Sequence, residues 1–375
     1  MKLLITQPYL NLKGGAERVL LKIAQHYDAK ILTVEYDKEK AFPEFKDLDV
    51  HVVKRDVPFS SMLPYRAAQG MLAGYTFYNM KIREDYDVLN SHTSPSEWIR
   101  HKNERVLWYC HTPIREVYDL YELRMKNRSY KQKALYFAFT SAYKMLSKDV
   151  IRDIEEIATN SENTNSRIRK YFGRSAQIIN PGVDIKEFRN DGDEKYFFYP
   201  SRFYINKRQD YVIDAFMRFQ KRTGLTNYKL ILAGSLSNDK EHIEYFERLK
   251  KMSAKNVIFK LSPTDKEIRD WYAGATAVLF AAVNEDYGIV PIEAMASGKV
   301  LISVNEGGPR ETMVDGKTGF LVNSSEEMAE KMKFVVEHGA IAEKMGKEAS
   351  RHAKNYTWDA FFKKFDILAR KVSKM

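Results

Sequence analysis

Short runs of apolar residues alternate with longer amphipathic stretches along the whole chain. In the first half, runs rich in β-branched and aromatic residues predict strands at 2–7, 30–35, 50–53, 88–91, 105–110, 156–160 and 177–180. In the second half, similar runs predict strands at 196–199, 229–233, 257–260, 277–280, 300–303 and 319–321. The stretches between them, such as 16–27 and 163–171, have the apolar spacing of helices.

This alternation of strands and helices predicts an α/β protein with two doubly wound, Rossmann-like domains. Polar residues and Gly192 interrupt the pattern at 189–195, so we place the domain boundary there. The expected parts are a first domain at 1–190, a second at 191–355 and a final helix at 356–375. Ligands of such sheets bind at the carboxyl ends of the strands, and the cleft between two such domains is the expected site.

The composition is that of a globular protein, with 44% hydrophobic and 30% charged residues in a chain of 375. No apolar run approaches the ~18 residues of a membrane span, and the first residues lack a secretory signal pattern. A single cysteine, Cys110, excludes an internal disulfide and fits a reducing cytosol. We therefore expect a cytoplasmic protein, or one held at the inner face of a membrane.

The net charge of +11 calls for an anionic partner, which is a nucleic acid, an acidic lipid or a phosphorylated small molecule. Twelve basic and five acidic residues between Arg100 and Arg152 form the most basic region. Binding of nucleic acid through this region is the non-enzymatic alternative. No known nucleic-acid-binding motif accompanies it, so we expect no nucleic-acid partner.

The stretch "NEDYGIVPIEAMASG" at 284–298 carries two glutamates around the start of a predicted helix. Gly288 allows close approach of the backbone, and Pro291 fits the first helical turn. The unpaired amides of Gly288, Ile289 and Val290 would then form an anion seat. Glu285 and Glu293 lie on either side of that seat and suit the hydroxyls of a sugar and of a ribose. The alternative is a core helix with two solvated glutamates.

Two further stretches have the residues of an anion site. In "SRFYINKRQD", Arg202 and Lys207 follow a predicted strand, and such cations neutralise a leaving diphosphate without a metal. In "GGAERV", Gly14 and Gly15 stand between a strand and a helix. This loop is not Gly-x-Gly-x-x-Gly, which argues against a dinucleotide cofactor. Asp191 and Asp193 suit a linker turn better than a metal site, so no metal is expected.

These stretches resemble the retaining family 4 glycosyltransferases. "EDYGIVPIEAMASG" is similar to the family pattern Glu-Gly-Phe-Gly-x-Pro-x-x-Glu-Ala-Met-Ala-x-Gly, and "GGPRE" to its following Gly-Gly-x-x-Glu. "SRFYINKRQD", "GGAERV", "INPGVDIKEF" and the terminal "YTWDAFFKKF" resemble other family segments. Asp286 and Tyr287 stand in place of the usual Gly and Phe, and Gly182 in place of a common Pro. The charge of Asp286 argues against an acidic donor sugar.

The resemblance implies the GT-B fold, with two facing domains and a last helix that returns to the first. It also implies retention of anomeric configuration without a covalent nucleophile, and no cofactor beside the nucleotide-sugar donor. The implied catalytic residues are His111, Glu285, Arg202 and Lys207. The implied donor-binding residues are Gly14, Gly15, Arg202, Lys207, Leu261, Ser262, Glu285, Tyr287, Gly288, Ile289, Val290 and Glu293.

The wording "YCHTPIREVYD" around His111 is similar to a bacterial and archaeal branch of mannosyltransferases. It implies GDP-mannose as the donor, with a glycan or a polyprenyl-diphosphate-linked acceptor. The alternatives are a UDP-sugar-dependent transferase, a nucleotide-sugar epimerase or a glucan synthase of the same fold. His92, in "NSHTSP", is a candidate on the acceptor side.

Between Leu123 and Lys148 there are seven basic residues and no acidic one, with aromatic residues interleaved. Such an amphipathic helix suits an anionic membrane surface. The aromatic-rich stretch 59–80 is expected beside it, where it would hold an apolar acceptor tail. The alternative is a helix that packs its aromatic side chains into the core and leaves its lysines in solvent.

Overall fold

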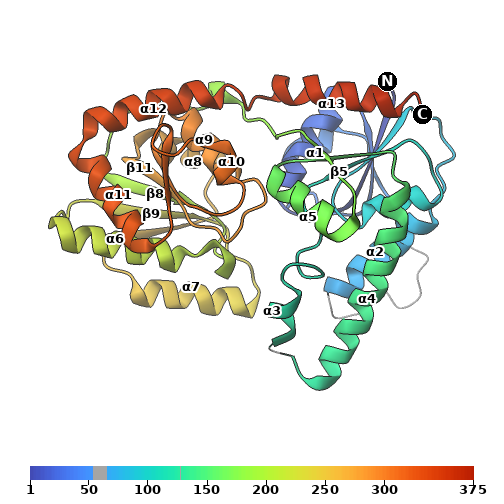
Figure 1. Cartoon of the computed structure of the whole chain (residues 1–375), viewed down its shortest axis with the longest axis horizontal. Helices are drawn as coiled ribbons and strands as arrows, with labels where there is room; N and C mark the ends of the chain where they lie inside the picture. Colours follow the sequence, from blue (N-terminus) through green and yellow to red (C-terminus); the bar gives the residue numbers. More distant parts are fainter. Residues whose placement is uncertain (54–65, 127) are drawn as a thin grey trace. The chain divides into compact units, whose positions relative to one another are not determined.

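The computed structural model describes residues 1–53, 66–126 and 128–375, which form two compact units (Figure 1). The first unit comprises Met1–Asn180 and Phe362–Met375, and the second comprises Pro181–Phe361. Part of the expected acceptor-tail stretch, 59–65, lies outside the described residues.

The division between the units comes at Asn180, before the boundary expected at residue 190. The reason is that the intervening residues hydrogen-bond within the second unit. The amide of Val183 donates to the carbonyl of Tyr356 at 2.9 Å, and the amide of Asp191 donates to the carbonyl of Ala273 at 2.9 Å. The last segment returns to the first unit from Phe362 rather than from residue 356.

The described part of the first unit contains a parallel sheet of seven strands in the order β3-β2-β1-β4-β5-β6-β7. Its strands are β1 (Leu3–Leu10), β2 (Lys30–Tyr36), β3 (Val50–Val52), β4 (Val88–Ser91), β5 (Val106–Cys110), β6 (Glu156–Thr159) and β7 (Gln177–Ile178). Its helices are α1 (Gly15–Tyr27), α2 (Arg66–Asn79), α3 (Tyr121–Lys126), α4 (Tyr130–Asp153) and α5 (Glu162–Phe172), with most of α13 (Trp358–Val372).

The second unit contains a parallel sheet of six strands in the order β10-β9-β8-β11-β12-β13. Its strands are β8 (Tyr196–Pro200), β9 (Lys229–Gly234), β10 (Val257–Leu261), β11 (Ala277–Phe280), β12 (Leu301–Val304) and β13 (Gly319–Val322). Its helices are α6 (Gln209–Thr223), α7 (Lys240–Met252), α8 (Asp265–Gly274), α9 (Ile289–Ala296), α10 (Pro309–Thr312), α11 (Ser325–Glu337) and α12 (Gly339–Ala353).

Each sheet is doubly wound, because successive strands run outward in both directions from a central pair. Right-handed crossovers then place helices on both faces. Figure 1 shows α6 and α7 on one side of the strands of the second unit, and α8 and α9 on the other. The central strands are buried on both faces, as every residue of β5, β8 and β11 shows. The predicted α/β fold class with two parallel sheets is confirmed.

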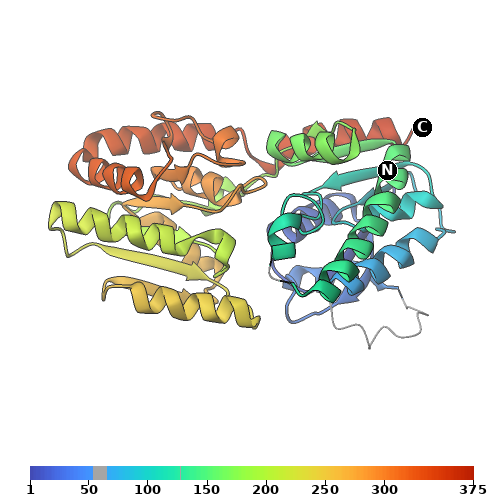
Figure 2. The same cartoon turned by 60° about the horizontal axis from the view of Figure 1, so that its bottom comes forward.

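Helices α2 and α4 lie side by side in the first unit (Figures 1 and 2). The buried Trp98 connects them, since its ring centroid lies 6.4 Å from that of Tyr78 in α2 and 5.2 Å from that of Tyr143 in α4. Its indole N–H also donates to the Ser147 hydroxyl of α4 at 3.0 Å. One face of α4 is therefore a core face, as the alternative interpretation of this helix expects.

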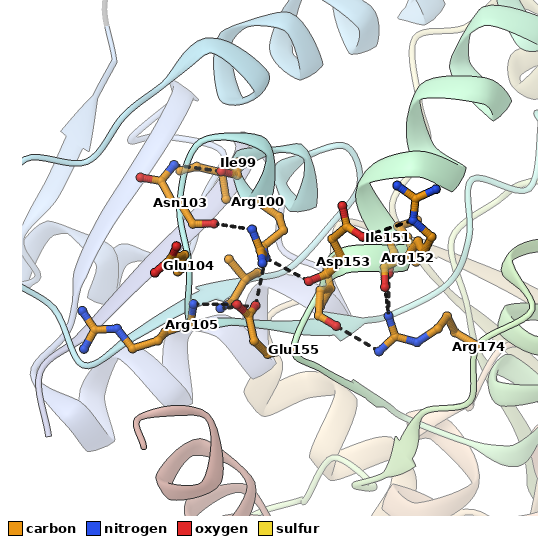
Figure 3. Close-up of polar contacts among 12 residues, drawn as sticks. Ile99, Arg100, Asn103, Glu104, Arg105, Ile151, Arg152, Asp153, Glu155 and Arg174 are labelled. Atoms are coloured by element: carbon orange, nitrogen blue, oxygen red, sulfur yellow. Dashed lines mark hydrogen bonds and ion pairs between the residues drawn. The ribbon is translucent and has the colours of Figure 1, made fainter. Parts of the chain in front are cut away.

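The carboxyl end of α4 is held by polar contacts at the base of the first sheet (Figure 3). Arg174 donates to the carbonyls of Ile151, Arg152 and Ile154 at 2.7–2.9 Å. These carbonyls are at a helix end, where they lack intrahelical donors, and a cation there also opposes the helix dipole. Arg100 donates to the Asp153 carbonyl at 3.0 Å in the same group of contacts.

The described helices include none long and apolar enough to cross a membrane. Nor do the described residues include a group of three or more His, Cys, Asp or Glu side chains suited to a metal ion.

Candidate active site

The candidate site of the second unit lies where its sheet changes direction, between β8 and β11. The loop after β8 carries Arg202 and Lys207, and the loop after β11 carries Glu285. The two loops meet, because the Val283 amide donates to the Asn206 carbonyl at 2.8 Å. Ligands of doubly wound sheets bind at this position, outside the carboxyl ends of the strands.

Lys207 and Glu285 form a close ion pair, with 2.5 Å between Nζ and Oε2. Their side chains are 14% and 25% exposed, so the pair is largely shielded from water yet open on one side. The hydroxyl of the buried Tyr199 donates to the Lys207 carbonyl and fixes the backbone there. An ammonium has three N–H donors, so Lys207 can contact a phosphate oxygen without releasing Glu285.

Arg202 lies on the same loop and is exposed. Its guanidinium carbon lies 5.0 Å from the centroid of the Tyr204 ring, which is cation–π distance. Stacking of this kind limits the directions in which an exposed arginine can point.

Two residues that sequence reasoning missed connect three loops of this edge. Arg208, with φ of 49°, donates from Nε to the Ala281 carbonyl at 2.7 Å and from its terminal nitrogen to Glu306 at 2.9 Å. The other oxygen of Glu306 accepts from the Asn284 amide at 3.2 Å. The available signal was position alone, since Arg208 follows Lys207 and Glu306 precedes a Gly-Gly pair.

The Gly-Gly pair of "GGPRE" packs directly against the backbone of the Glu285 loop. The Gly308 amide donates to the Glu285 carbonyl at 2.8 Å. A Cβ on Gly307 would lie 2.4 Å from the Glu285 carbonyl oxygen, and a Cβ on Gly308 would lie 2.2 Å from that of Tyr287. Only glycines fit, and their closeness fixes the position of this loop.

Helix α9 begins at Ile289, directly after Gly288, which has φ of 80°. Gly288 has no side chain with which to cap the first turn, and Pro291 lies within that turn. The amides of Gly288, Ile289 and Val290 are therefore placed as the first donors of the helix, and the dipole favours an anion there. Ile289 and Val290 are half-buried.

The other donor-site candidates lie around this helix and along the same sheet edge. Glu293 accepts from the hydroxyl of the buried Tyr272 at 2.8 Å, and Tyr287 donates to the Pro181 carbonyl at 2.7 Å. Leu261 ends β10, which lies two strands from β8 in the sheet, and Ser262 follows it directly. Leu261 is 50% exposed, and Ser262 has φ of 50°.

Gly14, Gly15 and His111 belong to the first unit. Gly14 is the N-cap of α1, between that helix and β1, as the sequence pattern indicates. His111 follows β5 directly, and its Nε2 lies 3.1 Å from Nδ1 of His92, which follows β4. Burial lowers the pKa of His111 to about 3, so its imidazole is neutral near pH 7.

Two family models match the chain one after the other. The model described as "Glycosyltransferase Family 4" matches residues 13–187, and the model described as "Glycosyl transferases group 1" matches residues 183–352. The chain belongs to these glycosyltransferases. The first match includes Gly14, Gly15 and His111 of this transferase, and the second includes the Lys207–Glu285 pair and α9.

Relatives of the transferase span its whole length. It is 25% identical to the alpha-1,3/1,6-mannosyltransferase ALG2 of Dictyostelium discoideum over 99% of this chain and 98% of the relative. It is 27% identical to ALG2 of Mus musculus over 93% of this chain and 91% of the relative. The expected resemblance to mannosyltransferases is thus confirmed.

Solved structures agree on the fold. HepE of Anabaena, crystallised with UDP and glucose, matches with a TM-score of 0.76 at 18% identity over 100% of both chains. Sucrose-phosphate synthase of Thermosynechococcus elongatus matches with a TM-score of 0.75 at 16% identity. The GT-B fold class expected for the transferase is confirmed.

Proposed function

We propose that this glycosyltransferase moves mannose from GDP-mannose to a glycan or lipid-linked acceptor, with retention of configuration. The observation that carries the proposal is the shielded Lys207–Glu285 pair at the switch point of the second sheet, where the loop that carries Glu285 leads into α9. The full-length similarity to proteins named as mannosyltransferases supports mannose over other hexoses.

In this mechanism the second unit binds the donor. Lys207, Arg202 and the first amides of α9 stabilise the diphosphate as the bond between its oxygen and the anomeric carbon breaks. The acceptor oxygen then bonds to the same face of that carbon, and its proton passes to the departing diphosphate oxygen. Glu285 accepts a hydrogen bond from a sugar hydroxyl, and Glu293 accepts one from the ribose.

The first unit binds the acceptor, and His111 contacts the donor sugar. Because its imidazole is neutral, His111 acts through hydrogen bonding rather than as an acid or a cation. No metal ion takes part in this mechanism, since the two cations and the helix amides supply the charge that the diphosphate requires.

A comparison of donors tests the proposal. Thermal shift and initial-rate assays with GDP-mannose, UDP-glucose and ADP-glucose should show the largest stabilisation and turnover with GDP-mannose. The second candidate, a UDP-sugar-dependent transferase, is favoured by the UDP and glucose bound in the similar HepE structure. Turnover with UDP-glucose and none with GDP-mannose would show that the protein is the UDP-sugar-dependent transferase instead.

The exposed face of α4 supports a lipid-linked acceptor at an anionic membrane. Tyr130, Phe137 and Met145 are 92%, 60% and 63% exposed, although large apolar side chains are usually buried. Their spacing of seven and eight residues puts them on one side of the helix, and Lys131 and Lys148 are exposed nearby. Apolar side chains flanked by lysines are typical of helices that lie in a membrane interface.

Co-sedimentation with liposomes tests this part. The double variant Lys131→Glu and Lys133→Glu should lose most binding to vesicles with an anionic lipid, because each cation near such a surface contributes ~1 kcal/mol. Lys363→Glu with Lys364→Glu on α13 changes the charge equally within the same unit and serves as the control. Unchanged sedimentation of the α4 variant would remove the membrane from the proposal.

A further inference from the structure

Three polar side chains form a hydrogen-bonded chain at the carboxyl ends of β4 and β5. Asn90 Oδ1 lies 2.9 Å from His92 Nε2, and His92 Nδ1 lies 3.1 Å from His111 Nε2. Asn90 and His92 are fully buried, and His111 is half-buried. Only the last of the three is therefore placed to meet a ligand.

The buried Asn90 decides which atoms donate and which accept along this series of hydrogen bonds. Asn90 Nδ2 donates to the Leu107 carbonyl at 2.9 Å, and rotation of the amide would set two carbonyl oxygens against each other. The amide oxygen of Asn90 must therefore face His92. Because that oxygen only accepts, His92 carries its proton on Nε2.

The protonation of His92 in turn decides which nitrogen of His111 carries a proton. Burial first, and then the neighbouring His111, lower the pKa of His92, so the ring is neutral and its Nδ1 is an acceptor. His111 Nε2 must then donate to it. Since His111 is also neutral, its remaining nitrogen, Nδ1, is an acceptor as well. Within the described part of the chain this nitrogen makes no hydrogen bond.

Neighbouring contacts keep both rings in place. The Trp108 indole donates to the His92 carbonyl at 2.8 Å, and Asn160 donates to the His111 carbonyl at 2.8 Å. The buried Tyr109 lies between the two histidines in sequence, with its ring centroid 4.9 Å from that of His111. Both rings therefore have little room to turn.

We propose that Asn90 and His92 are positioning residues that hold His111 in its Nε2–H tautomer, so that its Nδ1 accepts a hydrogen bond from a donor-sugar hydroxyl. This rests on the proposed function, in which His111 contacts the donor sugar. A lone pair repels a carboxylate at the same position, so the arrangement selects a neutral sugar against its uronic acid. A histidine of the opposite tautomer would present an N–H group, which can donate to a sugar hydroxyl and to a carboxylate and would therefore not distinguish the two sugars.

Nitrogen-15 NMR of the full-length chain labelled at histidine tests the tautomer directly. Long-range proton–nitrogen correlations should show His92 and His111 both neutral and protonated at Nε2, with assignment from His111→Gln. In Asn90→Leu, His92 loses its acceptor, so part of the His111 population should change to the Nδ1–H form. Asn160→Ala removes a bond to the His111 carbonyl and one from the Ser161 hydroxyl, but none to a histidine ring, so it should leave the ring tautomer unchanged. A wild-type spectrum with His111 protonated at Nδ1 would overturn the proposal, whether or not the variants fold.

Kinetics test the consequence. Asn90→Leu should lower kcat/KM for the neutral donor by about tenfold, the scale of one misdirected hydrogen bond. It should also reduce the preference for the neutral donor over its uronic acid counterpart. If kcat/KM and the preference for the neutral donor are both unchanged, Asn90 and His92 do not contribute to sugar transfer. If GDP-mannose is not the donor, the proposed function fails while the wild-type spectrum still reports the tautomer.

Discussion

The ion pair of Lys207 and Glu285 joins the two loops of the donor site through one short contact. A partly buried pair of this kind costs desolvation, so its stabilising value alone is a weak reason for its presence. A ligand that brings negative charge changes that balance, because Lys207 then neutralises two anions and Glu285 keeps the ammonium in place. The pair is thus better explained by binding than by stability.

Replacement of Lys207 by alanine should lower kcat/KM by a factor that corresponds to ~2–4 kcal/mol, the loss expected for a donor that stabilises transition-state charge. Initial rates with the donor at several concentrations measure it. Lys363→Ala, an exposed lysine of α13, is the matched control. Equal rates for the two variants would show that Lys207 does not contact the leaving group.

The low pKa of His111 predicts how stability depends on pH. The native state holds this histidine neutral down to about pH 3, whereas the unfolded chain takes up its proton near pH 6.5. The contribution of His111 to the free energy of unfolding is therefore fully present above pH 6.5. It is lost as the pH falls, by ~1.4 kcal/mol per pH unit for one such group. Urea unfolding at pH 7, 6 and 5 measures this slope. The slope should become shallower in His111→Gln, and an identical slope would contradict the assignment.

At the scale of elements, the Glu285 loop depends on its contact with a glycine of the next loop. Gly308 has ordinary helical φ and ψ, so alanine there meets no torsional strain, only the Tyr287 backbone 2.2 Å from the new Cβ. Gly308→Ala should therefore displace the loop and reduce turnover at least tenfold, because catalysis is sensitive to shifts of about 1 Å. Gly339→Ala, where the new Cβ meets nothing within 4 Å, is the control for rate measurements. Full activity in both variants would show that catalysis does not depend on the position of the Glu285 loop.

The carboxyl end of α4 offers a second test at this scale. Arg174→Ala leaves three helix-end carbonyls without their donor and should lower the free energy of unfolding by ~1–3 kcal/mol. Arg152→Ala removes an arginine whose side chain is 69% exposed and paired only at the surface, so it should leave stability nearly unchanged. Chemical denaturation compares them, and similar losses would argue against the capping role.

The elements themselves followed from local sequence. Apolar runs located the strands of both sheets, and Gly288 with Pro291 located the first residue of α9. The Arg208–Glu306 bond could not be predicted, because nothing local links two residues that far apart in the chain. Helix α4 was also ambiguous, since its sequence supports a core face and an exposed apolar face, and the structure has both.

At the scale of the whole molecule, part of the positive charge is used in contacts within the protein. Arg100, at the start of the basic region 100–152, donates to the Asp153 carbonyl and to Glu155, and Arg174 donates to carbonyls at the end of α4 (Figure 3). Lysines and arginines used in this way are not available for phosphates of a nucleic acid.

The first unit also includes the end of the chain. Phe365, Leu368 and Val372 of α13 are buried, and Tyr27 of α1 donates a hydrogen bond to Asp366. Deletion of 362–375 should therefore expose apolar surface and lower the melting temperature of the first unit by several degrees, since ~1 kcal/mol shifts a domain of about 200 residues by ~2–4 °C. Calorimetry of the shortened chain measures this, and an unaltered transition would show that the segment contributes nothing.

This arrangement also sets the order of biosynthesis. Ribosomes make the first 180 residues well before α13, the helix that covers α1. The first unit therefore exposes an uncovered apolar surface while the second unit is being translated. Only after residues 362–375 have been translated can the first unit reach its final state. Chaperone dependence and aggregation of nascent chains should thus be concentrated in that waiting period.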